Sequence, residues 1–104
     1  MSAYELFIEA DVLRARKDLP GHVRPRIKDA IAALAHEPRP PHSRPLDVTG
    51  LDVPPDIELR RLRIGAWRIL YAVHARERWV WVLALRRRPP YDYEDLGELA
   101  VRLR

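Results

Sequence analysis

The stretch that decides the fold is "IELRRLRIGAWRILYAVHARERWVWVLALRRR", residues 57–88. It holds three segments rich in β-branched, aromatic and aliphatic residues, separated by "GA" and "ARER". Both connections are too short for a crossover between parallel strands. Residues 57–64, 67–74 and 79–85 therefore predict a three-stranded antiparallel meander.

Alternation along these segments predicts which side chains share a face, because successive strand residues point to opposite sides. The bulky residues of the middle segment alternate, and we expect them to face the core: Trp67, Ile69, Tyr71 and Val73. This pattern sends Arg68 to the opposite face, together with Arg61 and Arg63 of the first segment. Arg60 falls inward under strict alternation, so we expect a β-bulge at Arg60–Arg61 or a position near the sheet rim.

The segments before residue 57 predict a strand and two helices. Residues 4–10 alternate well enough for a short strand, and Val12, Ala15 and Leu19 then recur at helical spacing. A second apolar helical face runs from Val23 to Ala35, with Pro25 tolerable in its first turn. Because "LPG" at residues 19–21 separates the two helices, we expect an αα-hairpin.

Two further segments complete the expected architecture. Residues 37–56 hold six of the ten prolines and predict a loop, either functional or packed flat over a sheet edge. Residues 91–103 form either a short C-terminal helix or a partly ordered tail, and Gly97 counts against the helix. The order β-α-α-β-β-β predicts an α+β fold in which the helical hairpin covers one face of an antiparallel sheet. The other face is expected to be open to solvent or to a partner.

Composition narrows the class of protein. A chain of 104 residues predicts one domain spanning residues 1–104, and the lack of cysteine excludes disulfides, thiolate metal sites and cysteine nucleophiles. The start lacks the pattern of a signal peptide, and no apolar run approaches the roughly 20 residues of a membrane helix. We therefore expect a cytoplasmic protein with no membrane partner. No carboxylate pair or His/Asp cluster indicates a metal, so no cofactor is expected.

The basic residues are almost all arginine. Of 19 basic residues 17 are arginine, and nine of these lie within residues 57–88 against only Glu58 and Glu77. The planar arginine fork pairs bidentately with phosphate, so this density favours an RNA or DNA partner. An arginine-rich composition with a merely solvated surface explains the same numbers equally well.

Three segments bring arginine toward one corner of the sheet. Arg61, Arg68 and Arg88 are expected to meet there, and the two prolines after Arg88 would hold Tyr91 or Tyr93 close by. A basic hollow with a tyrosine at its edge suits a phosphate backbone. The alternative is that the arginines are solvated and that "PPYDY" only covers a sheet edge.

The same residues resemble a known family. "ELRRLRIGAWRILYAV" followed by "WVWVLALRRR", with "LAHEPRPP" closing the second helix, resembles RelE/ParE-type toxins of bacterial type II toxin–antitoxin modules. The likeness covers nearly the whole chain, is closer to RelE-like mRNA interferases, and implies the RelE-like fold. It implies a toxin that forms a hetero-oligomer with a cognate antitoxin. RelE-like members are endoribonucleases that cleave mRNA on the ribosome and block translation, whereas ParE-like members inhibit DNA gyrase. A non-catalytic member that only binds its antitoxin is the third alternative.

The resemblance also implies roles for single residues. Arg68 matches the arginine that contacts the scissile phosphate, Arg61 stands where many members carry a lysine, and Arg88 matches a late basic residue. Tyr91 or Tyr93 would take the place of the C-terminal tyrosine. The expected catalytic set is therefore Arg61, Arg68, Arg88, Tyr91 and Tyr93, and the expected RNA-binding set is Arg60, Arg63, Arg86 and Arg87.

Arginine supplies only part of the chemistry of RNA cleavage. Guanidinium groups stabilise the charge that develops on phosphorus, but they stay protonated up to about pH 12 and cannot act as bases. Proton transfer then falls to a tyrosine, a histidine or the substrate itself. Both lysines, Lys17 and Lys28, lie in the helical hairpin. The histidines are weaker candidates: His74 is expected at the surface, and His22, His36 and His42 show no acid–base partner.

Overall fold

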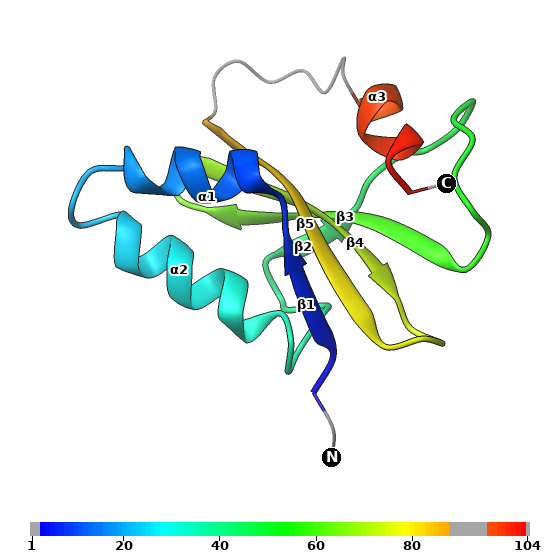
Figure 1. Ribbon diagram of the computed structural model, residues 1–104, viewed down its shortest axis with the longest axis horizontal. Helices are drawn as coiled ribbons and strands as arrows, with labels where there is room; N and C mark the ends of the chain where they lie inside the picture. The colour runs from blue at the N-terminus through cyan, green and yellow to red at the C-terminus, as the bar shows by residue number, and fades with distance from the viewer. Residues whose placement is uncertain (1–2, 88–95, 104) are drawn as a thin grey trace.

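The computed structural model describes residues 3–87 and 96–103. Its elements are β1 (Glu5–Ile8), α1 (Ala10–Lys17), α2 (Arg24–Ala33), β2 (Ser43–Pro45), β3 (Ile57–Ile64), β4 (Trp67–His74), β5 (Trp79–Arg87) and α3 (Leu96–Val101) (Figure 1). The predicted order of strands and helices is confirmed, with one extra strand, β2, inside the proline-rich loop. None of the helices in these two ranges combines the length and the apolar character that crossing a bilayer requires.

The five strands form one sheet in the order β1-β5-β4-β3-β2. The meander of β3, β4 and β5 is antiparallel throughout, as its short connections predict. β1 pairs in parallel with β5, and β2 pairs antiparallel with β3 at the other edge. The long strands, which carry six of the seven arginines in the sheet, therefore lie inside it, between two short edge strands.

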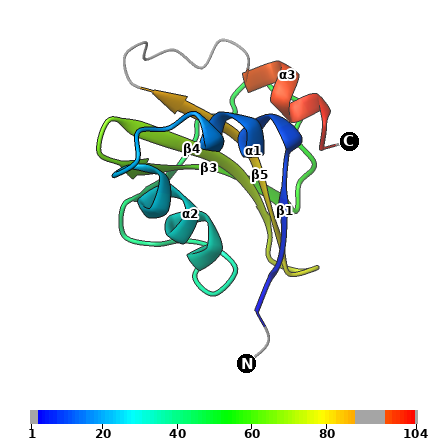
Figure 2. The ribbon, with the colours of Figure 1, turned by 60° about the vertical axis from the view of Figure 1, so that its left-hand side comes forward.

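The hairpin of α1 and α2 packs on one face of the sheet (Figures 1 and 2). The main core lies between them and consists of Val12, Leu19, Val23, Ile27, Ile31 and Leu34 from the hairpin and Leu62, Ile69, Tyr71, Val73, Val80 and Val82 from the sheet. This is the arrangement that the helical stripes and the strand alternation predict. Pro25 stands in the first turn of α2, where a missing backbone N–H is tolerated.

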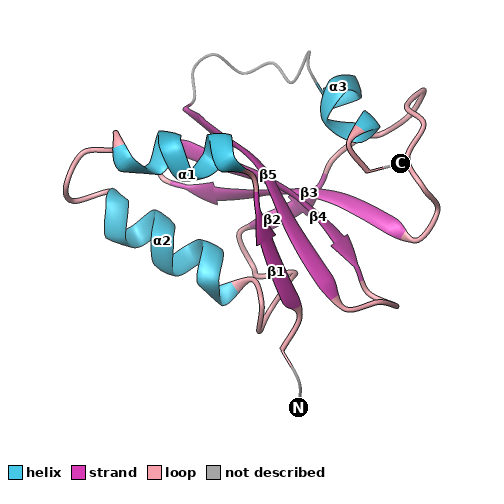
Figure 3. Ribbon diagram, in the orientation of Figure 1, coloured by secondary structure: helices cyan, strands magenta, loops and turns pink. Residues whose placement is uncertain are grey.

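The second face of the sheet is partly covered, and over that part the expectation of an open face is wrong. Helix α3 packs on it through Leu99, Ala100 and Leu103, against Leu59, Leu70, Ala72, Leu83 and Ala84 of the sheet. The loop between β2 and β3 runs past α3 (Figure 3) and adds Leu46, Val48, Leu51 and Val53. Burial of these apolar side chains is energetically favourable, so the proline-rich loop becomes part of a second core.

The sheet has one irregularity, and it lies in β5. Leu70 pairs with Ala84 while the next residue, Tyr71, pairs with Val82, so Leu83 is an extra residue. The pairing of β3 with β4 runs without interruption through Arg60 and Arg61. The expected bulge at these two arginines is therefore wrong.

Candidate functional site

The register of the sheet sets arginine directly opposite arginine in three ladder pairs. Arg44 of β2 pairs with Arg61, Arg63 of β3 pairs with Arg68, and Arg68 pairs in turn with Arg86 of β5. Directly paired residues share a face, and these five, which we call the arginine cluster, lie on the face that carries α3. Like charges directly opposite each other destabilise a sheet. The fold thus tolerates a loss of stability at these positions, as proteins commonly do at functional sites.

A polar hollow opens at the end of the cluster nearest the sheet edge. It measures about 210 Å³ and is lined by Pro41, His42, Arg44, Arg61 and Arg63. The backbone N–H of Arg63 donates to the carbonyl oxygen of His42 at 3.2 Å, which extends the β2–β3 ladder by one residue.

The arginines of this hollow have no acidic partner in the part of the chain that the structure describes. Ion pairs there involve other residues, and none joins a carboxylate to Arg44, Arg61 or Arg63. Three guanidinium groups and one imidazole around a single hollow favour an anionic ligand, because charge-assisted hydrogen bonds to such a ligand are strong.

Arg68 lies on the predicted face, but its guanidinium group hydrogen-bonds to the adjacent turn. Its side chain is only 5% exposed, and Nη1 donates to the carbonyl oxygens of Gly65 at 2.8 Å and Trp67 at 2.9 Å. Gly65 adopts a positive φ of 58°, which suits glycine in the tight turn between β3 and β4. Arg68 therefore has a structural task in addition to any contact with RNA.

Arg86 and Arg87 lie on opposite faces of the sheet. Arg86 belongs to the arginine cluster and also lines a hollow of about 320 Å³ next to Leu99 of α3. Arg87 lies below the helical hairpin, where it lines a hollow of about 570 Å³ with Trp67 and Arg26. The expected RNA-binding set is therefore divided between two surfaces.

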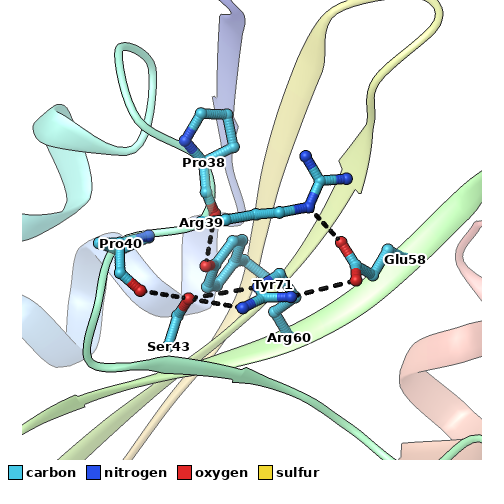
Figure 4. A network of polar contacts seen from close by, with 7 residues as sticks. All are labelled: Pro38, Arg39, Pro40, Ser43, Glu58, Arg60 and Tyr71. Atoms are coloured by element: carbon cyan, nitrogen blue, oxygen red, sulfur yellow. Dashed lines mark hydrogen bonds and ion pairs between the residues drawn. The ribbon is translucent and has the colours of Figure 1, made fainter.

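Arg60 is separated from the cluster because it points to the helix side of the sheet (Figure 4). It is 8% exposed, and Ser43 Oγ accepts from its Nε at 3.2 Å and its Nη2 at 2.8 Å. Its Nη1 pairs with Glu58 at 3.1 Å, and Glu58 also accepts from Arg39 Nε at 2.8 Å. The structure thus places Arg60 in a buried network rather than on the surface that Arg61 and Arg63 share.

The same network fixes the proline-rich segment to the sheet. The hydroxyl of Tyr71 donates to the carbonyl oxygen of Pro38 at 2.7 Å, and Ser43 Oγ donates to that of Pro40 at 2.8 Å. Burial raises the pKa of Tyr71 above its ordinary value, against the opposing effect of hydrogen bonds from Ser43 and Arg60. These contacts hold β2 in register, so they also position Arg44. A buried tyrosine needs a hydrogen-bond partner, and this was the only sequence signal for the network.

His74 is buried, contrary to the expectation that it lies at the surface. It is 8% exposed, its Nδ1 accepts from the backbone N–H of Glu77 at 3.1 Å, and its ring lies 5.2 Å from that of Trp79. Within residues 3–87 and 96–103, no three His, Asp or Glu side chains gather in a group that could hold a metal ion. Three expected site residues, Arg88, Tyr91 and Tyr93, lie outside the described residues.

Several solved structures with a similar fold are toxins or toxin–antitoxin complexes. A chain of the archaeal RelE–RelB complex from Pyrococcus horikoshii OT3 is 27% identical, with a TM-score of 0.72 over 86% of this chain and 99% of that chain. The RelBE2 toxin–antitoxin complex from Mycobacterium tuberculosis is similar at 20% identity, with a TM-score of 0.63 over 83% of this chain and 99% of that chain. The isolated RelE toxin of E. coli is similar at 22% identity, with a TM-score of 0.57 over 98% of this chain and all of that chain. The RelE-like fold that the resemblance implied is confirmed.

The family itself is shown by sequence. No curated protein sequence matches the chain significantly. The profile of one family, described as the ParE toxin of the type II toxin–antitoxin system parDE, matches residues 6–89. That range contains the hairpin, the whole sheet apart from the first residue of β1, and the arginine cluster. The chain therefore belongs to the ParE toxin family, and it is a toxin of a type II toxin–antitoxin system.

Proposed function

We propose that this toxin is a RelE-like endoribonuclease that cleaves mRNA on the ribosome and so blocks translation in the cytoplasm. The observation that carries the proposal is the arginine cluster, in which three cross-strand pairs place arginine directly opposite arginine in the ladder. A surface that only needs solvation has no reason to bear this repulsion. The similarity to a chain of the RelE–RelB complex, at 27% identity, supports the same function.

The reaction that suits these residues is cleavage through the neighbouring ribose hydroxyl. The 2′-oxygen attacks phosphorus and gives up its proton, and the bond from phosphorus to the 5′-oxygen breaks. The leaving oxygen takes a proton, so the products carry a 2′,3′-cyclic phosphate and a 5′-hydroxyl. Arg61 and Arg63 are suited to stabilise the negative charge that grows on the phosphorane oxygens.

Proton transfer is assigned to residues beyond the described surface. We propose Tyr91 or Tyr93 for this step or for stacking on a base, with Arg88 as a further phosphate contact, as the family resemblance implies. Arg86 would bind RNA on the same face, and Arg87 would do so only where RNA reaches the helix side. Arg60 is assigned to positioning, because its guanidinium lies in the network with Ser43 and Glu58.

The partner in the resting state is a cognate antitoxin. The P. horikoshii and M. tuberculosis structures are complexes with their own antitoxins, and we propose a toxin–antitoxin hetero-oligomer here too. In the active state the partner is mRNA on the ribosome.

Two assays in parallel test the proposal. Purified toxin is added to a reconstituted translation system and to a gyrase supercoiling reaction, with the Arg61→Ala variant beside the wild type in each. We expect the wild type to stop translation and cut the messenger while supercoiling continues, and we expect the variant to lose most of the cleavage. Intact messenger at full toxin dose would refute the proposal.

Inhibition of DNA gyrase is the second candidate, and two observations favour it. The matching family profile is that of ParE, and both lysines lie in the helical hairpin, Lys17 in α1 and Lys28 in α2, so none lies on the sheet. Loss of supercoiling with intact messenger would establish this alternative. If neither assay responds and expression leaves growth unchanged, the protein is a binding-only member whose arginines hold the antitoxin.

A further inference from the structure

The hollow at the β2–β3 edge contains two residues outside the expected site, namely Arg44, which no sequence pattern singled out, and His42, which was only a weak acid–base candidate. His42 and Arg44 come from the proline-rich segment, and they face Arg61 and Arg63 across the edge of the sheet. The segment is far from β3 in sequence, and the buried bonds from Ser43 to Arg60 and Pro40 hold it in place. The hollow thus forms where the proline-rich segment packs against β3.

The side chains that line the hollow favour an anionic ligand. All its polar lining groups other than backbone are arginine or histidine, and the three guanidinium groups have no acidic partner in residues 3–87 or 96–103. Arg44 and Arg61 are direct neighbours in the ladder, so their forks are placed to bind the same tetrahedral group.

The edge of the sheet argues against a peptide strand as the ligand. β2 is an edge strand, and strand addition would need free backbone donors along it. The N–H of Ser43 is already bonded to the carbonyl oxygen of Pro40 at 2.9 Å, and Pro45 has no N–H. A ligand must instead lie across the face of the sheet, as a nucleic acid backbone can.

We propose that His42 and Arg44 complete, with Arg61 and Arg63, a phosphate subsite that holds the RNA backbone at the scissile bond. The inference rests on the proposed ribonuclease function. Strands lie about 4.8 Å apart, so the subsite is within one or two strands of Arg68 and Arg86. An RNA strand that crosses the meander would meet the subsite with one phosphate and Arg86 with another. Arg44 and His42 are then binding residues, and the network around Arg60 keeps them in position.

The test measures binding without cleavage. The probe is a short single-stranded RNA with 2′-O-methyl groups, which prevents attack by the 2′-oxygen, and fluorescence anisotropy follows its binding to the purified full chain at several salt concentrations. Arg44→Gln should weaken binding several-fold and flatten the slope of log K against log salt by about 0.7, the value for one phosphate contact on a single strand. Arg44→Lys keeps the charge but not the fork and should recover part of the affinity.

Arg76→Gln is the matched control, since Arg76 is an exposed arginine on the β4–β5 turn that pairs with Asp56 at 3.7 Å. It removes the same charge and should bind RNA as the wild type does. If Arg44→Gln binds no more weakly than this control, the subsite is refuted while the ribonuclease proposal stands. If the wild type itself fails to bind RNA at low salt, the subsite is refuted, and the translation assay decides the ribonuclease proposal separately.

A glutamate-rich peptide distinguishes an acidic protein partner from RNA. It is titrated against the same variants under the same conditions. We expect Arg44→Gln to affect RNA binding more strongly than peptide binding. A variant that loses the peptide but keeps full affinity for RNA would overturn the inference and assign the hollow to an acidic polypeptide.

Discussion

Arg68 and Arg61 show how neighbouring arginines on one face can take different tasks. Strand alternation predicts that both point away from the main core, and the register agrees. Arg68 then folds back on the turn that precedes it and is nearly buried, whereas Arg61 is half-buried and lines the hollow. Alternation fixes the face of a side chain but not its hydrogen bonds. The bonds of Arg68 depend on where the carbonyl oxygens of one turn point, which no local pattern reveals.

Substitution of Arg68 should therefore reduce stability as well as activity. Arg68→Ala leaves the carbonyl oxygens of Gly65 and Trp67 without their donor, and we expect the free energy of unfolding to fall by about 1–3 kcal/mol. Urea unfolding measures this change. Arg61→Ala is the control and should leave stability unchanged or slightly higher, because it relieves repulsion with Arg44. Equal stability of the Arg68 variant and the wild type would show that the turn does not need this side chain.

Tyr71 should couple stability to alkaline pH. Tyr71→Phe removes the donor to the Pro38 carbonyl oxygen, so we expect a loss of about 1 kcal/mol at neutral pH. Burial raises the pKa of Tyr71, and an unfolded tyrosine has a pKa of about 10. The folded state thus holds the phenolic proton more tightly, and this contribution is present below about pH 10 and lost as the pH rises through the folded pKa. Unfolding curves from neutral to alkaline pH should show the difference between the two proteins shrinking. A constant difference would contradict this assignment.

At the scale of elements, the patterns within the chain predicted what is local and failed where distant segments meet. The αα-hairpin and the meander follow from periodicity in single segments. β2 has only three residues and ends in Pro45, so its own sequence does not predict a strand. It becomes a strand only because β3 pairs with it. The parallel pairing of β1 with β5 is likewise invisible before the chain folds. The hollow was missed for the same reason, since half of its polar lining, His42 and Arg44, comes from β2 and the residue before it.

Helix α3 depends on its packing for stability, because six residues form a marginal helix alone. Leu99 is 4% exposed in the second core, so Leu99→Ala should lower the free energy of unfolding by about 2–3 kcal/mol. Val101 lies on the same helix and is 54% exposed, and Val101→Ala should change stability by less than about 0.5 kcal/mol. Thermal unfolding of both variants checks this contrast. Equal effects would mean that α3 does not cover the sheet as described.

For the molecule as a whole, the two faces of the sheet contribute differently to stability. The helix side carries the main core and the stability of the fold. The α3 side combines a smaller core with the arginine cluster, so the proposed binding surface and part of the core share one face. Composition alone left RNA binding and mere solvation about equal, because counting arginines does not show which of them meet. The register shows which arginines meet, because it places arginine opposite arginine.

The rate of messenger cleavage in reconstituted, stalled ribosome complexes is the most direct measurement of the central claim. The wild type and the Arg61→Ala/Arg63→Ala double variant are compared in a single turnover, and the new 5′ ends are mapped. The wild type should cut the messenger only when it is bound to the ribosome, and the double variant should be slower by about 100-fold or more, the scale expected when groups that stabilise transition-state charge are removed. Messenger that stays intact with the wild type, or that the double variant cuts at the wild-type rate, would contradict the account.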